Sequence, residues 1–226
     1  MIEFVSINHH IQKHIIDVLM YQEKARFRDL KPPRVDTNLF SYHLKLLQKA
    51  SIVQKDDTGY SLAQRGMSYV DRVSSEKRTI RTQPKIVTML LVQNGDGDVL
   101  LQKRTKQPYI GTWTLPYGKL HIEDGSVEAA GRREAFEKLG LDNQPLRHAG
   151  DCYIRVTMAD GAMLSSTLVH VCTFNRDDIV TSDTIQWARP HKLRDYKLAP
   201  AVEEIVTRGF FHDPFFFEEF TLQLED

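Results

Sequence analysis

Residues 118–141, GKLHIEDGSVEAAGRREAFEKLGL, decide the fold of the second half of this 226-residue chain. The stretch begins at a glycine turn and then enters a predicted helix, for which Ser126 is a suitable N-cap. Gly140 fits the left-handed position just beyond the helix end. At about 100° per residue, Glu134 and Glu137 lie on one face of this helix, one turn apart. The stretch therefore predicts a helix that presents two carboxylates beside a glycine-rich loop.

Two carboxylates in this arrangement suit a hard cation. Mg²⁺ is commonly held by one or two protein carboxylates and completes its shell with water and substrate phosphate. The small residues 129–131 would let another backbone approach the helix. The alternative is that Glu134 and Glu137 are solvated charges on a surface helix, with Arg132, Arg133 and Lys138 as partners. The helix alone leaves both interpretations open.

The composition places the chain among ordinary globular proteins. It is 41% hydrophobic and 27% charged, and no apolar run approaches the ~20 residues that a membrane span needs. The first residues lack a cationic start followed by an apolar stretch, so no signal peptide is expected. Cys152 and Cys172 have no metal-type spacing and are expected to be buried free thiols. We therefore expect a cytoplasmic protein without membrane partners.

Charge is divided unevenly along the chain. Residues 1–80 contain 13 Lys and Arg against 9 Asp and Glu, a net charge of +4, and residues 81–226 contain 17 against 21, a net charge of −4. This mild asymmetry permits a nucleic-acid-binding N-terminal half but does not demonstrate one.

The N-terminal half has helical periodicity interrupted by one hairpin. Asp36 or Thr37 can cap the third helix. A broad apolar face is expected on that helix, formed by Leu39, Phe40, His43, Leu44, Leu46 and Leu47. The predicted elements are helices at 8–21, 26–30 and 36–50, a hairpin at 51–63 and a helix at 63–73. This order of elements is that of a winged helix-turn-helix.

The segment LFSYHLKLLQKASIVQKDDTGYSLAQRG, residues 39–66, resembles winged-helix regulators of the ArsR and MarR type. The resemblance covers most of residues 8–75 and implies that the third helix enters the major groove of double-stranded DNA. His43 is expected to pack on the apolar side. The alternative is a winged helix that serves as a protein-interaction module. The DNA-contacting residues implied by the resemblance are Asn38, Ser41, Tyr42, Lys45 and Lys49 on the helix and Lys55 on the wing.

The second half changes from helical to strand periodicity. A polar, basic segment at 76–84 is the best linker candidate, so the predicted domains are 1–75 and 85–226, the second ending in an aromatic tail. Strands are expected at KIVTMLLVQ, VLLQKR, CYIRVTMAD, AMLSSTLVHVCTF and DTIQWA, with a last helix at APAVEEIVTRGFF. Strands around a few helices indicate an α+β fold.

The pattern VLLQKR…GTWTLPYGKL…REAFEKLGL…W resembles the Nudix hydrolase family over roughly residues 84–210. The family signature is G-x5-E-x7-R-E-U-x-E-E-x-G-U, where U is aliphatic, and residues 133–141 match its right-hand end. The resemblance implies an α/β/α sandwich with a mixed sheet, which follows the winged helix. It also implies metal-assisted hydrolysis of nucleoside diphosphates linked to another group.

The chain departs from the signature in ways that bear on function. The interval from Gly118 to Arg133 is one residue too long, so the left-hand acid falls at Asp124 when counted from Gly118 and on Gly125 when counted from Arg133. Ala135 stands at an aliphatic position, and Pro116-Tyr117-Gly118 stands where Pro-Gly-Gly is usual. The Glu-Glu pair has become Glu137-Lys138, which replaces a metal ligand with a cation.

The resemblance assigns site roles residue by residue. Glu134, Glu137 and Asp124 are the implied catalytic residues, and Glu134, Glu137 and Glu123 the implied ligands of Mg²⁺ or Mn²⁺. Gly118, Lys119, Arg104 and Lys138 are the implied ligand contacts. Lys138 disfavours a second cation and could instead bind phosphate directly. Asp160 or Asp183 from a later loop could supply a compensating carboxylate. Metal binding is therefore expected to be weakened or lost relative to the family.

Two functions follow from these residues, and a scaffold with neither activity is a third alternative. The favoured one is a metabolite-responsive transcriptional regulator, in which a Nudix domain binds a nucleoside-diphosphate-type ligand and a winged helix binds DNA. The alternative is an active Mg²⁺-dependent Nudix pyrophosphohydrolase. Regulators that combine these two modules suggest an ADP-ribose-type ligand, although there the Nudix domain comes first. The tail GFFHDPFFFEEF, with six phenylalanines, is expected to be buried, within the chain or in a homodimer.

Overall fold

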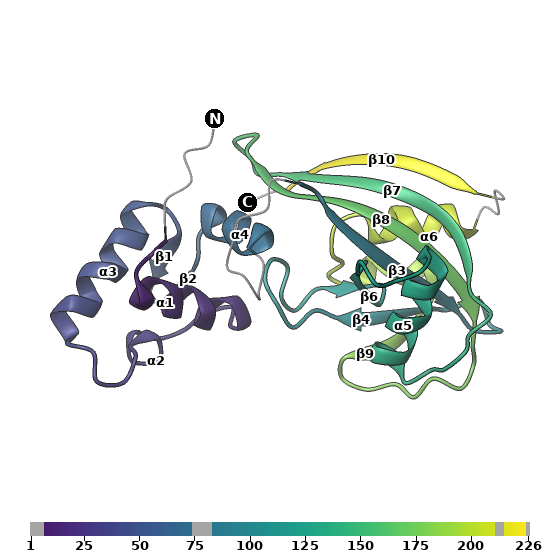
Figure 1. Cartoon of the computed structure of the whole chain (residues 1–226), viewed down its shortest axis with the longest axis horizontal. Coiled ribbons are helices and arrows are strands. Elements are labelled where there is room, and N and C mark those ends of the chain that lie inside the picture. Colours follow the sequence, from purple (N-terminus) through teal and green to yellow (C-terminus); the bar gives the residue numbers. More distant parts are fainter. Residues whose placement is uncertain (1–6, 74–82, 211–214, 225–226) are drawn as a thin grey trace. The chain divides into compact units, whose positions relative to one another are not determined.

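The computed structural model describes residues 7–73, 83–210 and 215–224. The chain forms two compact units, and each is treated by itself (Figure 1). The first comprises Met1–Thr82 with Thr105–Ile110, and the second comprises Gln83–Arg104 with Gly111–Asp226. Most of the predicted linker, residues 76–82, lies outside the described residues.

The first unit has the predicted order of elements, which is that of a winged helix-turn-helix. Its helices are α1 (His10–Tyr21), α2 (Phe27–Leu30) and α3 (Thr37–Lys49), followed by the antiparallel hairpin β1 (Val53–Asp56) and β2 (Gly59–Leu62) and by helix α4 (Gln64–Arg72). The predicted cap of α3 is confirmed, because the Asp36 side chain accepts hydrogen bonds from the backbone N–H groups of Asn38 and Leu39.

The wing is shaped by its turn residues. The Asp56 carboxylate accepts hydrogen bonds from the backbone N–H groups of Thr58 and Gly59, which closes the turn. Gly59 has a φ of 154°, and a Cβ there would lie 2.8 Å from the carbonyl oxygen of Ala25. Only glycine therefore allows Tyr60 to exchange two backbone hydrogen bonds with Ala25, which joins the hairpin to the segment before α2.

The core of this unit uses a narrower stripe of α3 than the sequence suggested. Phe40, His43, Leu44 and Leu47 are buried, and they follow the i, i+3, i+4, i+7 spacing of one helix face. The other two predicted core positions, Leu39 and Leu46, are 45% and 37% exposed. The prediction of a broad apolar face is wrong for these two residues, because they flank the buried stripe.

Replacing Phe40 by alanine is expected to destabilise the winged helix by about 3–5 kcal/mol. Phe40 is fully buried, and its ring packs edge-on against Phe27 at a centroid distance of 4.9 Å. Urea unfolding followed by far-UV circular dichroism would measure the loss. Tyr42→Ala is the matched control, because Tyr42 lies on the same helix but is 58% exposed. Equal losses in the two variants would contradict the assigned core.

The second unit is built on an eight-stranded mixed sheet. Its path runs β10-β7-β8-β3-β4-β5, with β6 paired to β3 and β9 to β4. The β3–β8 and β10–β7 pairs are parallel, whereas the other pairs are antiparallel. The strands are β3 (Lys85–Gln93), β4 (Val99–Lys103), β5 (Trp113–Thr114), β6 (Tyr117–Lys119), β7 (Arg147–Thr157), β8 (Met163–Asn175), β9 (Ile185–Ala188) and β10 (Phe216–Gln223).

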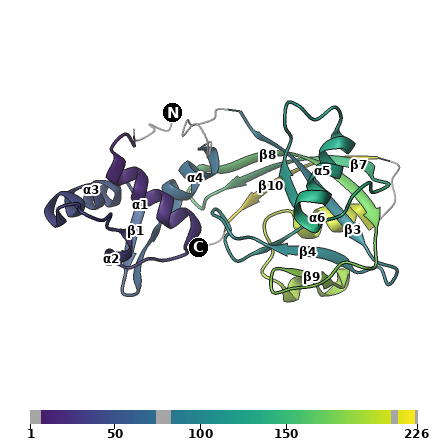
Figure 2. The same ribbon diagram turned by 60° about the horizontal axis from the view of Figure 1, so that its bottom comes forward.

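Helices cover both faces of this sheet (Figure 2). On one face, α5 (Val127–Leu139) places Ala135 in a cluster with Leu90 and Val92 of β3. On the other face lies α6 (Val202–Phe210), where a Cβ on Gly209 would meet the side chain of Leu91. A short 3-10 helix, η1 (Pro190–Asp195), precedes α6. The predicted α/β/α sandwich with a mixed sheet is confirmed.

The aromatic tail is only partly buried within the chain. It forms β10, an edge strand parallel to β7, after residues 211–214, which lie outside the described residues. Phe216 is buried, but Phe215 and Phe217 are 48% and 60% exposed. Alternate side chains of a strand point to opposite faces of the sheet, so these two lie on the face opposite to Phe216. Within the chain they are not covered, and their burial in a homodimer stays a prediction.

The described residues also bear on the cysteines and on membrane crossing. Cys152 and Cys172 are free and buried, and burial raises the pKa of each thiol to about 12. Among the described helices, none has the length and apolar character that a membrane crossing requires.

Candidate functional site

Strand β6 brings a glycine directly under a buried carboxylate of α5. In the β3–β6 pair, Gly118 lies opposite Thr88, and α5 crosses above them. A Cβ on Gly118 would lie 1.9 Å from the carboxyl carbon of Glu134. The glycine is therefore needed so that the Glu134 carboxylate can rest against the backbone of β6.

Glu134 has one satisfied and one unsatisfied oxygen. Its side chain is 3% exposed, and its Oε1 accepts a hydrogen bond of 2.6 Å from Nη1 of Arg133. Its Oε2 is buried and has no hydrogen-bond partner within the described part of the chain. Burying a carboxylate oxygen without a partner is costly. A divalent cation beside Oε2 would remove that cost, so the site fits Mg²⁺ or Mn²⁺.

Arg133 organises the carboxylates around the helix. Its Nε and Nη2 donate to the two oxygens of Asp124 at 2.9 and 2.8 Å, and Nη2 also donates to the backbone oxygen of Lys119 at 2.9 Å. Its Nη1 reaches Glu137 at 3.4 Å. Asp124 is thus the residue of this loop that binds Arg133, and its assignment as the left-hand acid of the signature stays a prediction. Because both of its oxygens are engaged by Arg133, Asp124 positions the arginine and the loop.

The Asp124–Arg133 pair predicts a pH dependence of stability. Hydrogen bonding to Arg133, with a smaller contribution from the His121 backbone, lowers the pKa of Asp124 from 3.8 to about 2. Because the folded-state pKa is lowered, this stabilisation is present above pH ~4 and is lost as the pH falls through about 2. The pair is expected to contribute roughly 1–3 kcal/mol at neutral pH.

Urea unfolding at several pH values between 6 and 2 would measure this contribution as the difference between wild type and Asp124→Asn. The difference should narrow steadily below pH 4. A difference that stays constant down to pH 2 would show that ionisation of Asp124 is not its source.

The remaining predicted site residues are brought together only in part. Glu137 has a half-exposed side chain, 46%, and shares Arg133 with Glu134. Lys138 is exposed and lies one helical turn beyond Glu134, on nearly the same face of α5. Glu123 is exposed in the loop, and its assignment as a metal ligand stays a prediction. Arg104 donates to the hydroxyl of Tyr117 and lies over its ring, beside Gly118.

One residue of the site has no counterpart in the sequence prediction. The hydroxyl of Thr88 is fully buried and lacks a hydrogen-bond partner among the described residues, as does the nearby Glu134 Oε2. Thr88 comes from β3, thirty residues before Gly118. Only the strand pairing places it in the site, so no local sequence pattern could have identified it.

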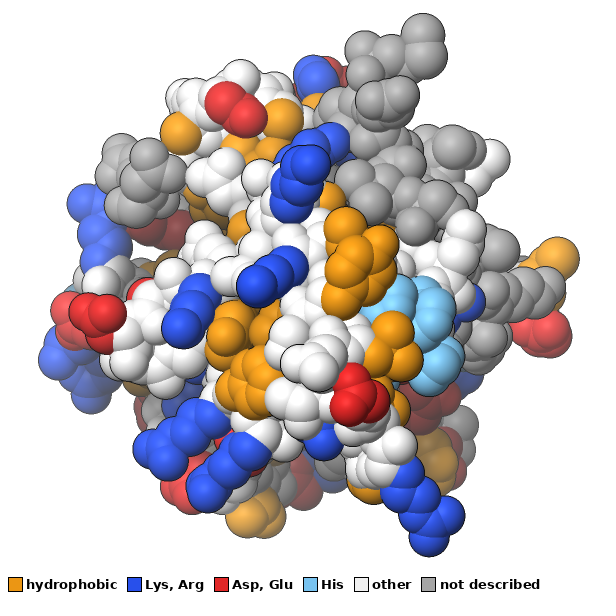
Figure 3. Space-filling model, turned by 90° about the vertical axis from the view of Figure 1, so that its left-hand side faces the viewer, with side chains coloured by type: hydrophobic (Ala, Val, Ile, Leu, Met, Phe, Trp, Pro, Cys, Tyr) orange, Lys and Arg blue, Asp and Glu red, His pale blue; other side chains and the backbone are white. Residues whose placement is uncertain are grey.

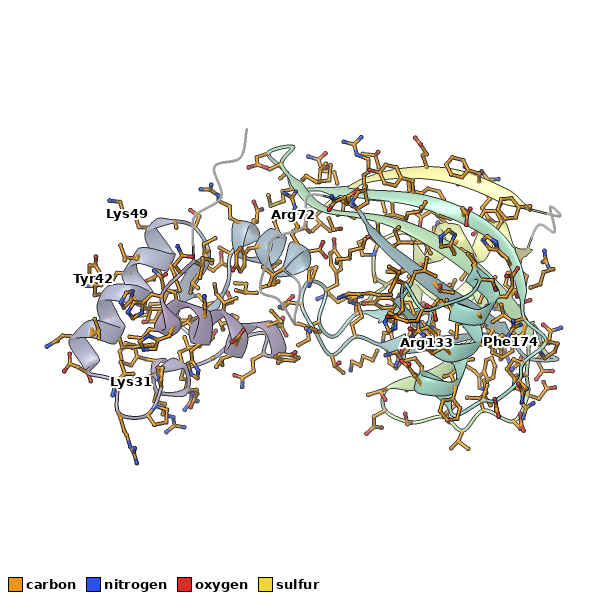
Figure 4. All side chains as sticks on the ribbon, viewed as in Figure 1. Lys31, Tyr42, Lys49, Arg72, Arg133 and Phe174 are labelled. Atoms are coloured by element: carbon orange, nitrogen blue, oxygen red, sulfur yellow. The ribbon has the colours of Figure 1, made fainter. Side chains whose placement is uncertain are left out.

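A second candidate site lies on α3 of the first unit. Tyr42 and Lys49 project outward from the helix (Figure 4). Lysine and arginine side chains surround exposed hydrophobic ones on the side of the molecule that Figure 3 presents. The predicted DNA contacts Asn38, Tyr42, Lys45, Lys49 and Lys55 are all exposed, and Ser41 is half-buried. This exposure is what a groove-reading helix requires, although exposure alone does not establish DNA contact.

His43 packs on the opposite side of α3, as predicted. It is 7% exposed and stacks on His9 at a ring-centroid distance of 3.8 Å. Burial, and then the neighbouring His9 and His10, hold the pKa of His43 below its ordinary value.

Comparisons with known proteins place the second unit in a family. The family model described as "NUDIX domain" matches residues 83–209. One similar solved structure is the NUDIX domain of Shewanella oneidensis NrtR complexed with ADP ribose, with 16% identity, coverage of 63% of this chain and 95% of that chain, and a TM-score of 0.46. Another is the MutT protein from Bacillus halodurans, with 18% identity, coverage of 61% and 89%, and a TM-score of 0.49. A third is S. oneidensis NrtR complexed with a 27mer DNA, with 15% identity, coverage of 55% and 59%, and a TM-score of 0.44.

The family match spans more than half of the 226 residues and contains both the Gly118 loop and helix α5. The chain therefore belongs to the NUDIX domain family.

Proposed function

We propose that this protein is a winged-helix DNA-binding regulator whose Nudix domain binds a nucleoside-diphosphate-type ligand. The observation that carries the proposal is the site on α5. It keeps a buried carboxylate with a free oxygen, Glu134, but has an exposed lysine, Lys138, where the family has a further acidic ligand. This combination favours binding of a phosphorylated ligand without its hydrolysis, because the site has less negative charge with which to bind several cations.

The chain's own residues define how such a ligand would be held. Glu134 and Glu137 would hold one Mg²⁺ or Mn²⁺ ion, which supplies charge neutralisation for the phosphates and activation of water. Lys138, one turn further along α5, would contact phosphate as a point charge. Gly118 keeps the carboxylate close to the β6 backbone, and Arg133 fixes the orientation of Glu134. We propose a cytoplasmic location for the protein. We also propose a homodimer, since winged helices commonly read paired half-sites.

The second candidate function is an active pyrophosphohydrolase. The observation that favours it is the intact pair of Arg133 and Glu134, with Glu137 one turn later on the same helix. These groups can hold one cation against a pyrophosphate even without a carboxylate at position 138.

One experiment separates the two functions. The full chain would be incubated with ADP-ribose, sugar nucleotides, dinucleoside polyphosphates or NADH, with Mg²⁺ or Mn²⁺, while binding is followed by calorimetry and products by chromatography. The regulator predicts binding with negligible turnover, and Glu134→Gln is expected to weaken that binding. Turnover that is lost in Glu134→Gln would establish the enzyme. If no compound is bound and none is hydrolysed, both functions are rejected and a scaffold role is favoured.

DNA binding has its own prediction. Duplexes would first be selected from a random library with the full chain. They should bind less tightly to Lys45→Ala and Lys49→Ala than to wild type. The steepness of log affinity against log salt concentration should fall by about 0.9 for each lost phosphate contact. Lys192→Ala, an exposed lysine of the second unit, is the matched control. Failure to enrich any duplex would reject the DNA-binding proposal and leave ligand binding standing.

A further inference from the structure

A group of two histidines and one aspartate lies outside the Nudix site. The Asp151 Oδ1 atom is 2.8 Å from Nε2 of His148 and 2.7 Å from Nδ1 of His170. All three potential ligand atoms lie within 4.8 Å of one another. The side chains are 20%, 22% and 15% exposed for His148, Asp151 and His170, so the group is shielded yet reachable from solvent.

The convergence of these side chains depends on an irregularity in β7. In a regular strand, residues three positions apart point to opposite faces of the sheet. A register shift between His148 and Gly150 leaves Ala149 without a partner in the β7–β8 ladder. This bulge turns His148 and Asp151 to the same face, while Asp151 lies directly opposite His170 on β8.

The group is separate from the Nudix site, although both lie on one sheet. One row of paired residues crosses strands β6, β3, β8 and β7. It contains, in that order, Gly118, Thr88, His170 and Asp151. His170 is thus two strand spacings, or about 10 Å, from Gly118. The two sites share no residue. They also differ in chemistry, because the Nudix site offers only oxygen ligands, which suit Mg²⁺ or Mn²⁺, whereas two imidazoles select zinc-like ions.

We propose that His148, Asp151 and His170 form a second metal site that binds one zinc-like divalent cation. Two imidazole nitrogens and one carboxylate oxygen are a common three-ligand set for Zn²⁺. Bonds of about 2.0–2.2 Å place the ligands of a tetrahedral ion roughly 3.4 Å apart, so Asp151 must withdraw by about half an ångström from each histidine. The fourth position would be open to water or to an anionic ligand. The proposal does not depend on the function proposed above.

The competing arrangement is a hydrogen-bonded triad without metal, in which one oxygen of Asp151 accepts from both imidazoles. Phe215 packs edge-on against the His148 ring at a centroid distance of 5.1 Å, which would orient that ring in either case. The two arrangements differ in one measurable respect. Only the metal site has an affinity for Zn²⁺ or Co²⁺ that depends on these three side chains.

The test uses the full chain after removal of metal with a chelator. Zn²⁺ affinity is measured by competition with a chromophoric chelator, and the coordination of Co²⁺ by its visible absorption. Replacing a residue that only supports a metal ligand already costs 10–100-fold in affinity, so Asp151→Asn or His170→Gln is expected to cost at least roughly 100-fold. Both variants should also lose the Co²⁺ absorption. His191→Gln, an exposed histidine of η1, is the matched control.

Two further variants make the result decisive. Glu134→Gln should bind Zn²⁺ as wild type does, which distinguishes this site from the Nudix site. If Asp151→Asn does not fold, as judged by far-UV circular dichroism, His148→Gln near the start of β7 takes its place. Zn²⁺ binding as strong in the folded variant, Asp151→Asn or His148→Gln, as in wild type would overturn the proposal. So would the absence of a one-to-one Zn²⁺ complex in the wild type.

Discussion

Replacing Lys138 by glutamate is expected to raise Mg²⁺-dependent hydrolysis of the proposed nucleoside-diphosphate-type ligand by roughly 30–100-fold. The change adds a carboxylate one helical turn beyond Glu134 and shifts the local charge by two units. Charge stabilisation by an additional bound cation is worth several kcal/mol in the transition state, and each 1.36 kcal/mol corresponds to a factor of about ten in rate. The expected gain in rate therefore corresponds to about 2–3 kcal/mol of recovered transition-state stabilisation.

Two controls separate ligand donation from simple charge removal. Lys138→Gln removes the ammonium without supplying a ligand and should recover only a small part of the gain. Lys192→Glu makes the same charge change at an exposed position of η1 and should leave the rate unchanged. Equal rates in Lys138→Glu and Lys138→Gln would show that position 138 does not bind metal. A rate unchanged in both would show that Lys138 is not what limits turnover.

Much of the site could be predicted because it follows local rules. Ser126 caps α5 by accepting a hydrogen bond from the backbone of Ala129, and Gly140 ends the helix in the left-handed conformation with a φ of 68°. Helical spacing then placed Glu134 and Glu137 on one face without further information. The same kind of rule predicted the Asp36 cap of α3 and the order of elements in the winged helix.

What could not be predicted depends on contacts between distant segments. Two hydrogen bonds join Asp124 to Arg133, and spacing alone could not show this contact because the interval is one residue longer than the signature. Thr88 enters the site only through the pairing of β3 with β6. His148 and Asp151 share a face only because of a bulge, and a sequence shows no bulge.

The misplaced apolar residues have a similar origin. Leu39 and Leu46 of α3 are hydrophobic enough to be counted in a core, but they lie just outside the stripe that the fold buries. Together with Tyr42 they give the exposed side of α3 an apolar component, which a DNA-reading helix can use against thymine methyl groups. Exposed apolar residues on this helix are therefore compatible with the proposed DNA contact and do not by themselves indicate a protein partner.

Replacing Gly118 by alanine is expected to weaken Mg²⁺ binding by at least roughly 100-fold and to destabilise the second unit by about 1–3 kcal/mol. A Cβ at this position would lie 1.9–2.0 Å from the three carboxylate atoms of Glu134, well inside contact distance. Glu134 is 2% exposed, so its carboxylate cannot swing into solvent to relieve the overlap. It must leave the β6 backbone, and Oε2 then leaves the place where a cation would meet it.

Gly125→Ala is the matched control, because Gly125 lies in the loop between β6 and α5 and a Cβ there would meet nothing within 4 Å. Calorimetric titration with Mg²⁺ and urea unfolding would measure the two effects. A double-mutant cycle tests their cause, since Glu134→Ala removes the atoms that the new methyl group would strike. In that background Gly118→Ala should cost less than about 0.5 kcal/mol, and the coupling between the two positions should account for the rest. If Gly118→Ala lowers the free energy of unfolding as much in the Glu134→Ala background as in wild type, the glycine is required by the β6 backbone alone. The carboxylate is then not the group that it accommodates.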